Sequence, residues 1–380
     1  MTSDRRAAGE SSIIRGADGR FHGYVSMGLK ENGKRDRRHV ASVKRADVVR
    51  RVRELEEQRD AGIVLASGRG LTVQQWMTLW LDTIASRKVR PSTLAGYRTC
   101  VNRISRHLGH FRLDRLQPEH LEAFYTQLEA DGLSSTTALL HHRVISRALK
   151  VAMQRGRVAR NVATLVDAPT ARRDEVQPLT TADARKILDL AKDLPNGTRW
   201  SVALALGLRQ GEALGLLWDA VDLDAGTLTV RRALQRQAGK GLVLVEPKSR
   251  AGRRTIKLPD ALRDALRTHR ARQAEQRLAA ANTWEDRDFV FCQTNGRPID
   301  ARRDWLDWKA LLRAAEIRNA RLHDARHTAA TLLLQQGVPA RVVMEILGHS
   351  QISLTLGTYS HVVPELAHEA AERMGDALWS

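Results

Sequence analysis

The stretch RLHDARHTAATLLLQQGV, residues 321–338, places polar side chains directly before an apolar helical run. His323 and Arg326 are three residues apart, so their side chains lie on the same face of a helix. The partial positive charge of a helix N-terminus adds to that of the arginine in attracting an anion. Asp324 and His327 lie beside them, and we expect their side chains to point elsewhere. The stretch therefore predicts a helix whose first turn binds an anionic group.

A second stretch with an arginine suited to the same anion is WSVALALGLRQGEALGLLWDAV, residues 200–221. Arg209 follows a strongly apolar helix and precedes Glu212 by three residues. An arginine next to a buried helix end needs an anionic partner or water. Glu212 could hold the guanidinium in place for a ligand, or the two residues could form an ordinary ion pair at a helix end.

The third stretch, EPKSRAGRRTIKLP at 246–259, predicts the two strands of a β-hairpin with SRAG as its turn. Lys248 would lie at the tip, where a lysine can reach a phosphate or donate a proton. Basic hairpin tips are commonly only solvated, so this stretch is weak evidence when taken alone. The same hairpin carries four other basic residues, which are Arg250, Arg253, Arg254 and Lys257.

The fourth stretch, LGHSQISLTLGTYSHV at 347–362, contains His349 and Tyr359. A helix is expected to end at Gly348, which leaves His349 just beyond it and Tyr359 on a short polar segment. Two other tyrosines, Tyr97 and Tyr125, occur at the spacing of helical core residues, so we predict that they only pack. Tyr359 has no such apolar setting.

Composition supports an anionic polymer as the partner. The 380 residues include 62 Lys and Arg against 43 Asp and Glu, a net charge of +19 that is spread along the chain. Such an excess attracts nucleic acid, although a merely solubilised surface is the alternative. The sequence has two cysteines and no metal-ligand spacing or phosphate-binding glycine loop, so we expect no metal and no cofactor. It also has no apolar run long enough to span a membrane and no export signal, so we expect a cytoplasmic protein.

These four stretches together suit attack on a phosphodiester. Two guanidiniums can neutralise the charge that develops on the phosphate oxygens. Concentrated positive charge lowers the pKa of a tyrosine hydroxyl and makes it a usable nucleophile. A protonated lysine could supply the proton for the leaving 5′ oxygen. The phosphotyrosyl link would keep the energy of the broken bond, so rejoining would need no ATP.

The rest of the chain predicts two smaller units. Residues 12–45 alternate as short strands, and a helix follows to about residue 61; a basic turn there could lie along a DNA groove or be a solvated hairpin tip. Its basic residues are Lys34, Arg35, Arg37 and Arg38. After a linker at 67–70, residues 71–165 predict four helices. The prediction is a multidomain, mainly α protein, with a small β insertion at 226–259 in its last part.

The set Arg209, Lys248, His323, Arg326, His349 and Tyr359 resembles the tyrosine recombinase (phage integrase) family in motif order and spacing. The resemblance implies the recombinase catalytic fold at 176–380 with a C-terminal tail helix, a core-type DNA-binding domain at 71–168, and an arm-type DNA-binding domain at 1–66. It also implies that Tyr359 forms a 3′-phosphotyrosine, that Arg209 and Arg326 bind the phosphate, and that Glu212 supports Arg209. His323 and His349 would hydrogen-bond the phosphate or assist proton transfer, and Lys248 would act as the general acid.

The expected function is therefore that of an integrase of a mobile element, working near the nucleoid on double-stranded attachment-site DNA as a homo-tetramer. A recombination directionality factor and a host DNA-bending protein are further expected partners. The tail has one apolar helical stripe, formed by residues four apart, and this stripe could pack on its own domain. The resemblance implies instead that the tail docks on a neighbouring protomer. The stripe consists of Leu366, Ala370, Met374 and Leu378. The alternatives are a resolvase-type recombinase, a type IB-like topoisomerase and a DNA-binding regulator without catalysis.

Overall fold

The computed structural model describes residues 12–29, 35–60, 70–171, 177–247 and 250–348, with 371–372, 374–376 and 378–379 near the end. Contacts group the chain into two compact units, Met1–Arg173 and Asp174–Ser380. The three predicted domains, 1–66, 71–168 and 176–380, place a further boundary inside the first unit, and that division stays a prediction. The described elements are mostly helices with small antiparallel sheets, which confirms the predicted fold class. None of the helices in the described ranges is long and apolar enough to cross a membrane.

The first described elements are a three-stranded antiparallel sheet, in the order β1-β2-β3, and one helix. Their bounds are β1 Ser12–Arg15, β2 Phe21–Leu29, β3 Arg35–Ser42 and α1 Arg45–Asp60. Alternate residues of a strand point to one face, so Val25 and Met27 meet Val48 and Val52 of α1 in a small buried cluster. The predicted strands and helix are confirmed.

The helical part of the first unit has its own core. Its elements are α2 Val73–Leu79, the π-helical turn η1 Trp80–Ala85, α3 Pro91–Leu108, η2 Leu113–Arg115, α4 Pro118–Ala130, α5 Ser135–Gln154 and η3 Val162–Thr164. Trp76 is fully buried, and its indole donates a hydrogen bond to the carbonyl of Ala148. Tyr125 is buried, and Tyr97 stacks on Trp80 with ring centroids 5.6 Å apart. Both tyrosines pack, as predicted.

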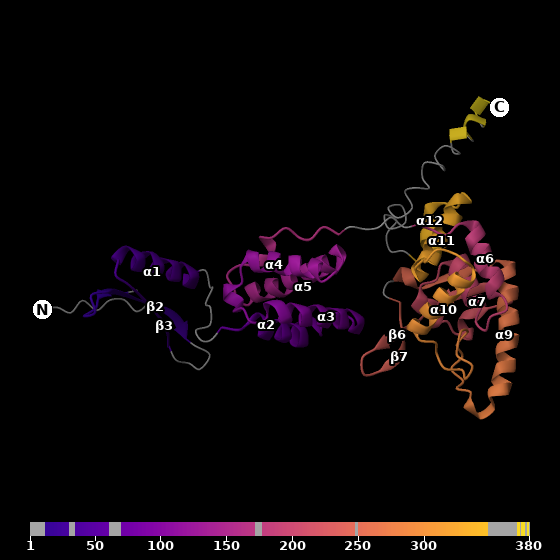
Figure 1. The fold of residues 1–380 in the computed structure, drawn as a ribbon, viewed down its shortest axis with the longest axis horizontal. Helices are drawn as coiled ribbons and strands as arrows, with labels where there is room; N and C mark the ends of the chain where they lie inside the picture. The colour runs from indigo at the N-terminus through magenta and orange to yellow at the C-terminus, as the bar shows by residue number, and fades with distance from the viewer. Residues whose placement is uncertain are drawn as a thin grey trace. The chain divides into compact units, whose positions relative to one another are not determined.

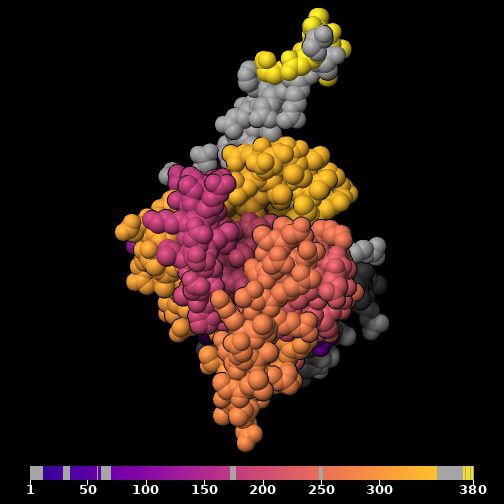
Figure 2. All heavy atoms as spheres, turned by 90° about the vertical axis from the view of Figure 1, so that its right-hand side faces the viewer, coloured from indigo at the N-terminus to yellow at the C-terminus, as the bar shows by residue number. Residues whose placement is uncertain are grey.

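The second unit is built mainly from helices (Figure 1). They are α6 Thr181–Ala191, α7 Thr198–Leu206, α8 Gln210–Leu214, η4 Trp218–Ala220, α9 Asp260–Ala280, η6 Ala281–Thr283, α10 Ala301–Ala314, α11 Leu322–Gln335 and α12 Ala340–Leu347. Figure 2 shows a face on which the magenta region of α6 and the orange region of α9 both reach the surface. Between the helices, Trp200 and Trp308 pack with ring centroids 5.3 Å apart.

The β insertion forms two small sheets instead of one hairpin. Its strands are β4 Val221–Asp222, β5 Thr227–Val230, β6 Ala233–Gln237, β7 Gly241–Val245 and β8 Arg254–Lys257, with the 3₁₀ turn η5 Arg250–Gly252 before β8. β7 pairs with β6, in a hairpin that projects from the helical body in Figure 1, whereas β8 pairs with β5. The SRAG stretch therefore connects two sheets, and its prediction as a hairpin turn is wrong.

Candidate active site

The turn between α7 and α8 holds Arg209. Gly207 ends α7 with φ 61°, a left-handed conformation that glycine adopts without strain. Glu212 lies in the first turn of α8, where its carboxylate accepts the backbone N–H of Arg209 at 3.1 Å and Nη1 at 2.7 Å. The side chain of Arg209 is 41% exposed, against 5% for Glu212. A buried carboxylate thus fixes a guanidinium that remains open to solvent.

Arg326 reaches the same turn from α11. It is buried, and its Nη1 donates to the carbonyl of Gly207 at 2.8 Å while Nη2 donates to that of Leu347 at 2.6 Å. The backbone turn that presents Arg209 is therefore bound directly by the second predicted phosphate ligand. Residues 119 positions apart in sequence meet here, as the prediction of a common site requires.

The C-terminal end of α12 is capped by three arginines. The carbonyls of Ile346, Leu347 and Gly348 accept hydrogen bonds from Arg254 at 2.5 Å, Arg326 at 2.6 Å and Arg209 at 3.2 Å, respectively. The last carbonyls of a helix lack partners within it and carry a partial negative charge, so guanidiniums suit them. Gly348 ends the helix with φ 67°, which confirms the predicted helix end immediately before His349.

Arg254 is the residue in this cluster that the sequence reasoning did not single out. It lies on β8 with its side chain 7% exposed, and its Nη2 donates to Oε2 of Glu212 at 2.9 Å. Burial alone would raise the pKa of Glu212, but the charges and hydrogen bonds of Arg254 and then Arg209 outweigh it and lower that pKa. Arg254 also precedes the buried Ile256 by two residues, which places both on one face of the strand. This alternation is the sequence signal that could have identified Arg254 as a residue on the buried face of the strand.

His323 stands in the first turn of α11, as predicted. Desolvation by the surrounding protein lowers the pKa of its imidazole, and the positive charges of Arg326 and Arg209 lower it further. At neutral pH the ring is therefore uncharged and can either donate or accept one proton. Asp324 turns away and accepts the backbone N–H of Arg321 at 2.7 Å, which caps the helix. The ring of His327 lies edge-on to the ring of His323, with 4.8 Å between the ring centroids. The prediction that His327 points elsewhere is therefore wrong.

A cavity of about 160 Å³ adjoins this turn of α11. Its lining includes Gln210, His323 and Arg326, and also the buried Arg199. Arg199 donates from Nη2 to Asp304 at 3.2 Å, whereas its Nε and Nη1 have no hydrogen-bond partner among the described residues. Gln210 donates to the same carboxylate at 3.0 Å. Asp304 of α10 thus anchors the first residue of α8, directly after Arg209.

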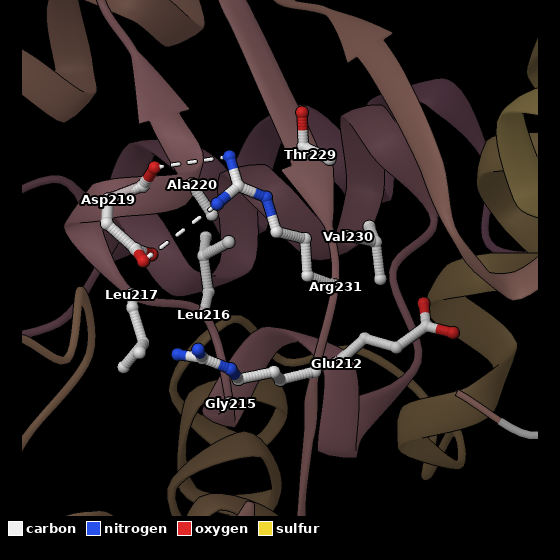
Figure 3. Close-up of a pocket in the computed structure, with 10 residues that line it drawn as sticks. Glu212, Gly215, Leu216, Leu217, Asp219, Ala220, Thr229, Val230 and Arg231 are labelled. Atoms are coloured by element: carbon white, nitrogen blue, oxygen red, sulfur yellow. Dashed lines mark hydrogen bonds and ion pairs between the residues drawn. The ribbon is translucent and has the colours of Figure 1, made fainter. Parts of the chain in front are cut away.

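A second pocket lies on another side of α8, lined in part by Glu212, Gly215 and Arg231. Figure 3 shows Arg231 turned toward Asp219, while the side chain of Glu212 extends away from that pair. Nη1 of Arg231 lies 3.9 Å from the Asp219 carboxylate, and both side chains are half exposed. Since Arg231 already has a partner, we assign this pocket no role in the arginine cluster.

Three predicted catalytic residues, Lys248, His349 and Tyr359, lie outside the described residues, as does the predicted DNA contact Lys34. The structure does bring together Arg209, Glu212, His323 and Arg326. It also places Gly348, the residue before His349, beside Arg209. Among the described residues, His, Cys, Asp and Glu form no group of three or more that could hold a metal ion.

The other predicted DNA contacts of the N-terminal sheet are Arg35, Arg37 and Arg38. They belong to strand β3 and not to a turn, because β3 begins at Arg35. Arg35 and Arg37 are exposed, and the guanidinium of Arg37 lies 4.7 Å from the ring centroid of Tyr24. These residues belong to the first compact unit and are separate in sequence from the arginine cluster.

Comparison with known proteins identifies the class to which this fold and site belong. Residues 173–365 match the phage integrase family, and residues 72–128 match the N-terminal SAM-like domain of phage integrases. The chain therefore belongs to the phage integrase family. It is a site-specific tyrosine recombinase of mobile elements, an integrase.

Individual relatives extend these matches. An integrase of Saccharopolyspora erythraea is 39% identical over 429 aligned positions, which cover 99% of this chain and 98% of that protein. The Tn1549 transposon integrase in complex with circular intermediate DNA has a TM-score of 0.69 at 23% identity, covering 80% of this chain and all of that one. A lambda integrase dimer bound to a core site has a TM-score of 0.58 at 15% identity, covering 93% of this chain and 96% of that one. Both structures share the fold.

Proposed function

We propose that this integrase cleaves and rejoins DNA through a 3′-phosphotyrosyl intermediate formed by Tyr359. Arg209 and Arg326 bind the scissile phosphate, Glu212 supports Arg209, and His323 with His349 hydrogen-bonds the phosphate or moves a proton. Lys248 protonates the 5′ oxygen as it leaves. The observation that carries the proposal is the convergence of three arginines on the end of α12, immediately before His349.

The charges of the described residues suit this chemistry. Arg209 combines a fixed orientation with 41% exposure, so a phosphate oxygen from solvent can reach it. His323 has a lowered pKa and is neutral at pH 7, so it can take or give a proton as a hydrogen-bonding partner of the phosphate. Two guanidiniums near one phosphate would stabilise the charge that develops as the tyrosine attacks.

The remaining parts of the proposal concern partners. We propose that residues 1–66 bind arm-type sites, with the exposed Arg35 and Arg37 among the DNA contacts, and that residues 71–168 bind core sites. On attachment-site DNA the protein forms a homo-tetramer in the cytoplasm, with a directionality factor and a host DNA-bending protein as further partners. The exposure of Met374 and Leu378 in the tail supports docking on a neighbouring protomer.

The test uses duplex DNA from the boundary of the mobile element that encodes the chain, nicked close to the crossover so that cleavage is trapped. Wild-type protein is expected to form an SDS-resistant adduct with the DNA, and Tyr359→Phe is expected to bind the DNA without forming one. An adduct formed equally by Tyr359→Phe would exclude this nucleophile. Retarded DNA without any adduct would favour a binding-only protein, and relaxation of supercoils without strand exchange would favour topoisomerase behaviour.

A further inference from the structure

Arg254 connects three segments of the active-site cluster that are distant in sequence. From β8, its Nε donates to the carbonyl of Ile346 at 2.5 Å, and its Nη2 donates to Glu212 at 2.9 Å. Its Nη1 donates to the carbonyl of Gly252 at 3.3 Å. One guanidinium thus joins α8, the end of α12 and the turn before its own strand.

We propose that Arg254 is a positioning residue for DNA strand cleavage, which orients Arg209 through Glu212 and fixes the end of α12 beside it. This inference rests on the proposed function, because it assigns Arg254 a part in the same reaction. All three nitrogens of Arg254 are engaged by protein acceptors and its side chain is 7% exposed, whereas Arg209 is 41% exposed.

The link to Arg209 passes through the carboxylate of Glu212. Oε1 accepts Nη1 of Arg209, while Oε2 accepts both the backbone N–H of Arg209 and Nη2 of Arg254. With both oxygens bound, the carboxylate cannot rotate without breaking a charged hydrogen bond. Removal of Arg254 would leave Oε2 with one backbone donor, and the carboxylate could then turn and carry the Arg209 guanidinium with it.

The link to α12 depends on a close approach at Gly348. A Cβ at this position would lie 2.8 Å from Nη1 of Arg254 and 2.7 Å from the carbonyl oxygen of Ala251. Glycine therefore lets the helix end lie directly against the guanidinium, where Ile346 accepts its hydrogen bond. Because residue 348 precedes His349 and the segment of Tyr359, the path of the chain into that segment begins at a point that Arg254 holds.

Electrostatics gives this role a signature in pH. Among the described residues, the charged groups that contact Glu212 are Arg209 and Arg254. Burial favours the protonated carboxyl, and the two arginines together overcome it. Without Arg254 the pKa of Glu212 would rise, so the carboxylate would become protonated at a higher pH than in the wild type. Its ion pair with Arg209 would be lost at the same pH.

The experiment measures the rate of adduct formation in single turnovers with the nicked attachment-site duplex, at saturating full-length protein, across a range of pH. Arg254→Met is expected to cleave about 100-fold more slowly, as displacement of a positioned group by about 1 Å can cost this factor. Its affinity for DNA should not change. As the pH is lowered, its cleavage rate should begin to fall at a higher pH than the rate of the wild type does. Arg254→Lys should recover part of the rate and of the pH profile, because the charge returns while one ammonium cannot span all the acceptors.

Arg253→Ala is the matched control. Arg253 is the preceding residue on the chain, but it is exposed and pairs with the exposed Glu246, so its loss should leave the rate at saturation unchanged. The inference is overturned if Arg254→Met cleaves at the wild-type rate. It is also overturned if the cleavage rate falls by the same factor at every pH and in proportion to the unfolded fraction of the variant. It is also overturned if only DNA affinity falls, since Arg254 would then be a DNA contact. A wild type that forms no adduct would instead refute the proposed function, and this inference with it.

Discussion

The buried carboxylate of Glu212 offers a direct measure of how strongly the arginine cluster is held together. Glu212→Gln keeps the shape of the side chain and one oxygen acceptor but removes the charge between Arg209 and Arg254. Removing one partner of a buried ion pair costs about 3–5 kcal/mol. Arg209 can turn to water and glutamine still accepts a hydrogen bond, so we expect the lower end of that range. A loss of about 3 kcal/mol corresponds to a melting temperature lower by about 6–12 °C for a unit of roughly 200 residues.

The pH dependence of this difference follows from the lowered pKa of Glu212. A carboxyl whose pKa is lowered on folding stabilises the fold above its ordinary value of 4.5. That contribution is lost as the pH falls below 4.5 and through the folded pKa. The wild type and Glu212→Gln should therefore differ fully at pH 7 and converge in acid, because glutamine does not titrate.

Calorimetry of the full-length chain, following the transition of the unit 174–380, is the assay. Glu246→Gln is the control, since this carboxylate is 77% exposed and pairs with the exposed Arg253. Exposed pairs contribute about 0–1 kcal/mol, so its melting temperature should hardly change. Equal stability of Glu212→Gln and wild type at pH 7, or a difference that does not shrink in acid, would refute the reasoning.

Two further predictions concern single residues near the cluster. Gly348→Ala should destabilise the protein by more than a strained backbone alone, which costs about 1–3 kcal/mol, because φ is 67° and the new Cβ would also lie 2.7 Å from the Ala251 oxygen. The control in thermal denaturation is Gly239→Ala, where φ is 74° and a Cβ would have no atom within 4 Å. Equal losses of stability in the two variants would contradict the clash. Burial lowers the pKa of His327 to about 4, so NMR should find its ring neutral at pH 6. The stability of the protein should fall as the pH drops from 6.5 toward 4, because the unfolded chain binds the proton more tightly. A titration midpoint of the ring near 6.5 would show that it is not desolvated.

The sequence was sufficient wherever the signal is local. The helix of residues 322–335, the left-handed helix end at Gly348 and the strands of the N-terminal sheet follow from periodicity and from glycine positions. The pairing of strands was not predictable in the same way. SRAG has the composition of a turn, but β8 pairs with β5, which precedes it by more than twenty residues, and local turn chemistry carries no information about that partner.

The candidate site shows the same division. Arg209, Glu212, His323 and Arg326 lie close together, while their roles in the reaction stay a prediction. Arg254 was one of several basic residues on a single stretch. Its burial is set by the neighbours that α8 and α12 bring to it, which only the folded chain reveals. His327 was misjudged for a simpler reason, because residues four apart on a helix share a face with each other as residues three apart do.

The three-arginine cap on α12 constrains how the length of this helix can vary. Each residue of an α-helix advances the chain by about 1.5 Å and turns it by about 100°. A deletion of one residue within 340–347 would therefore move all three terminal carbonyls out of line with donors that are fixed in the turn before α8, on β8 and on α11. Substitutions on the exposed face of α12, such as at the half-exposed Val342, leave those carbonyls in place. Divergent versions of this chain should thus tolerate changes of residue in α12 much more readily than insertions or deletions.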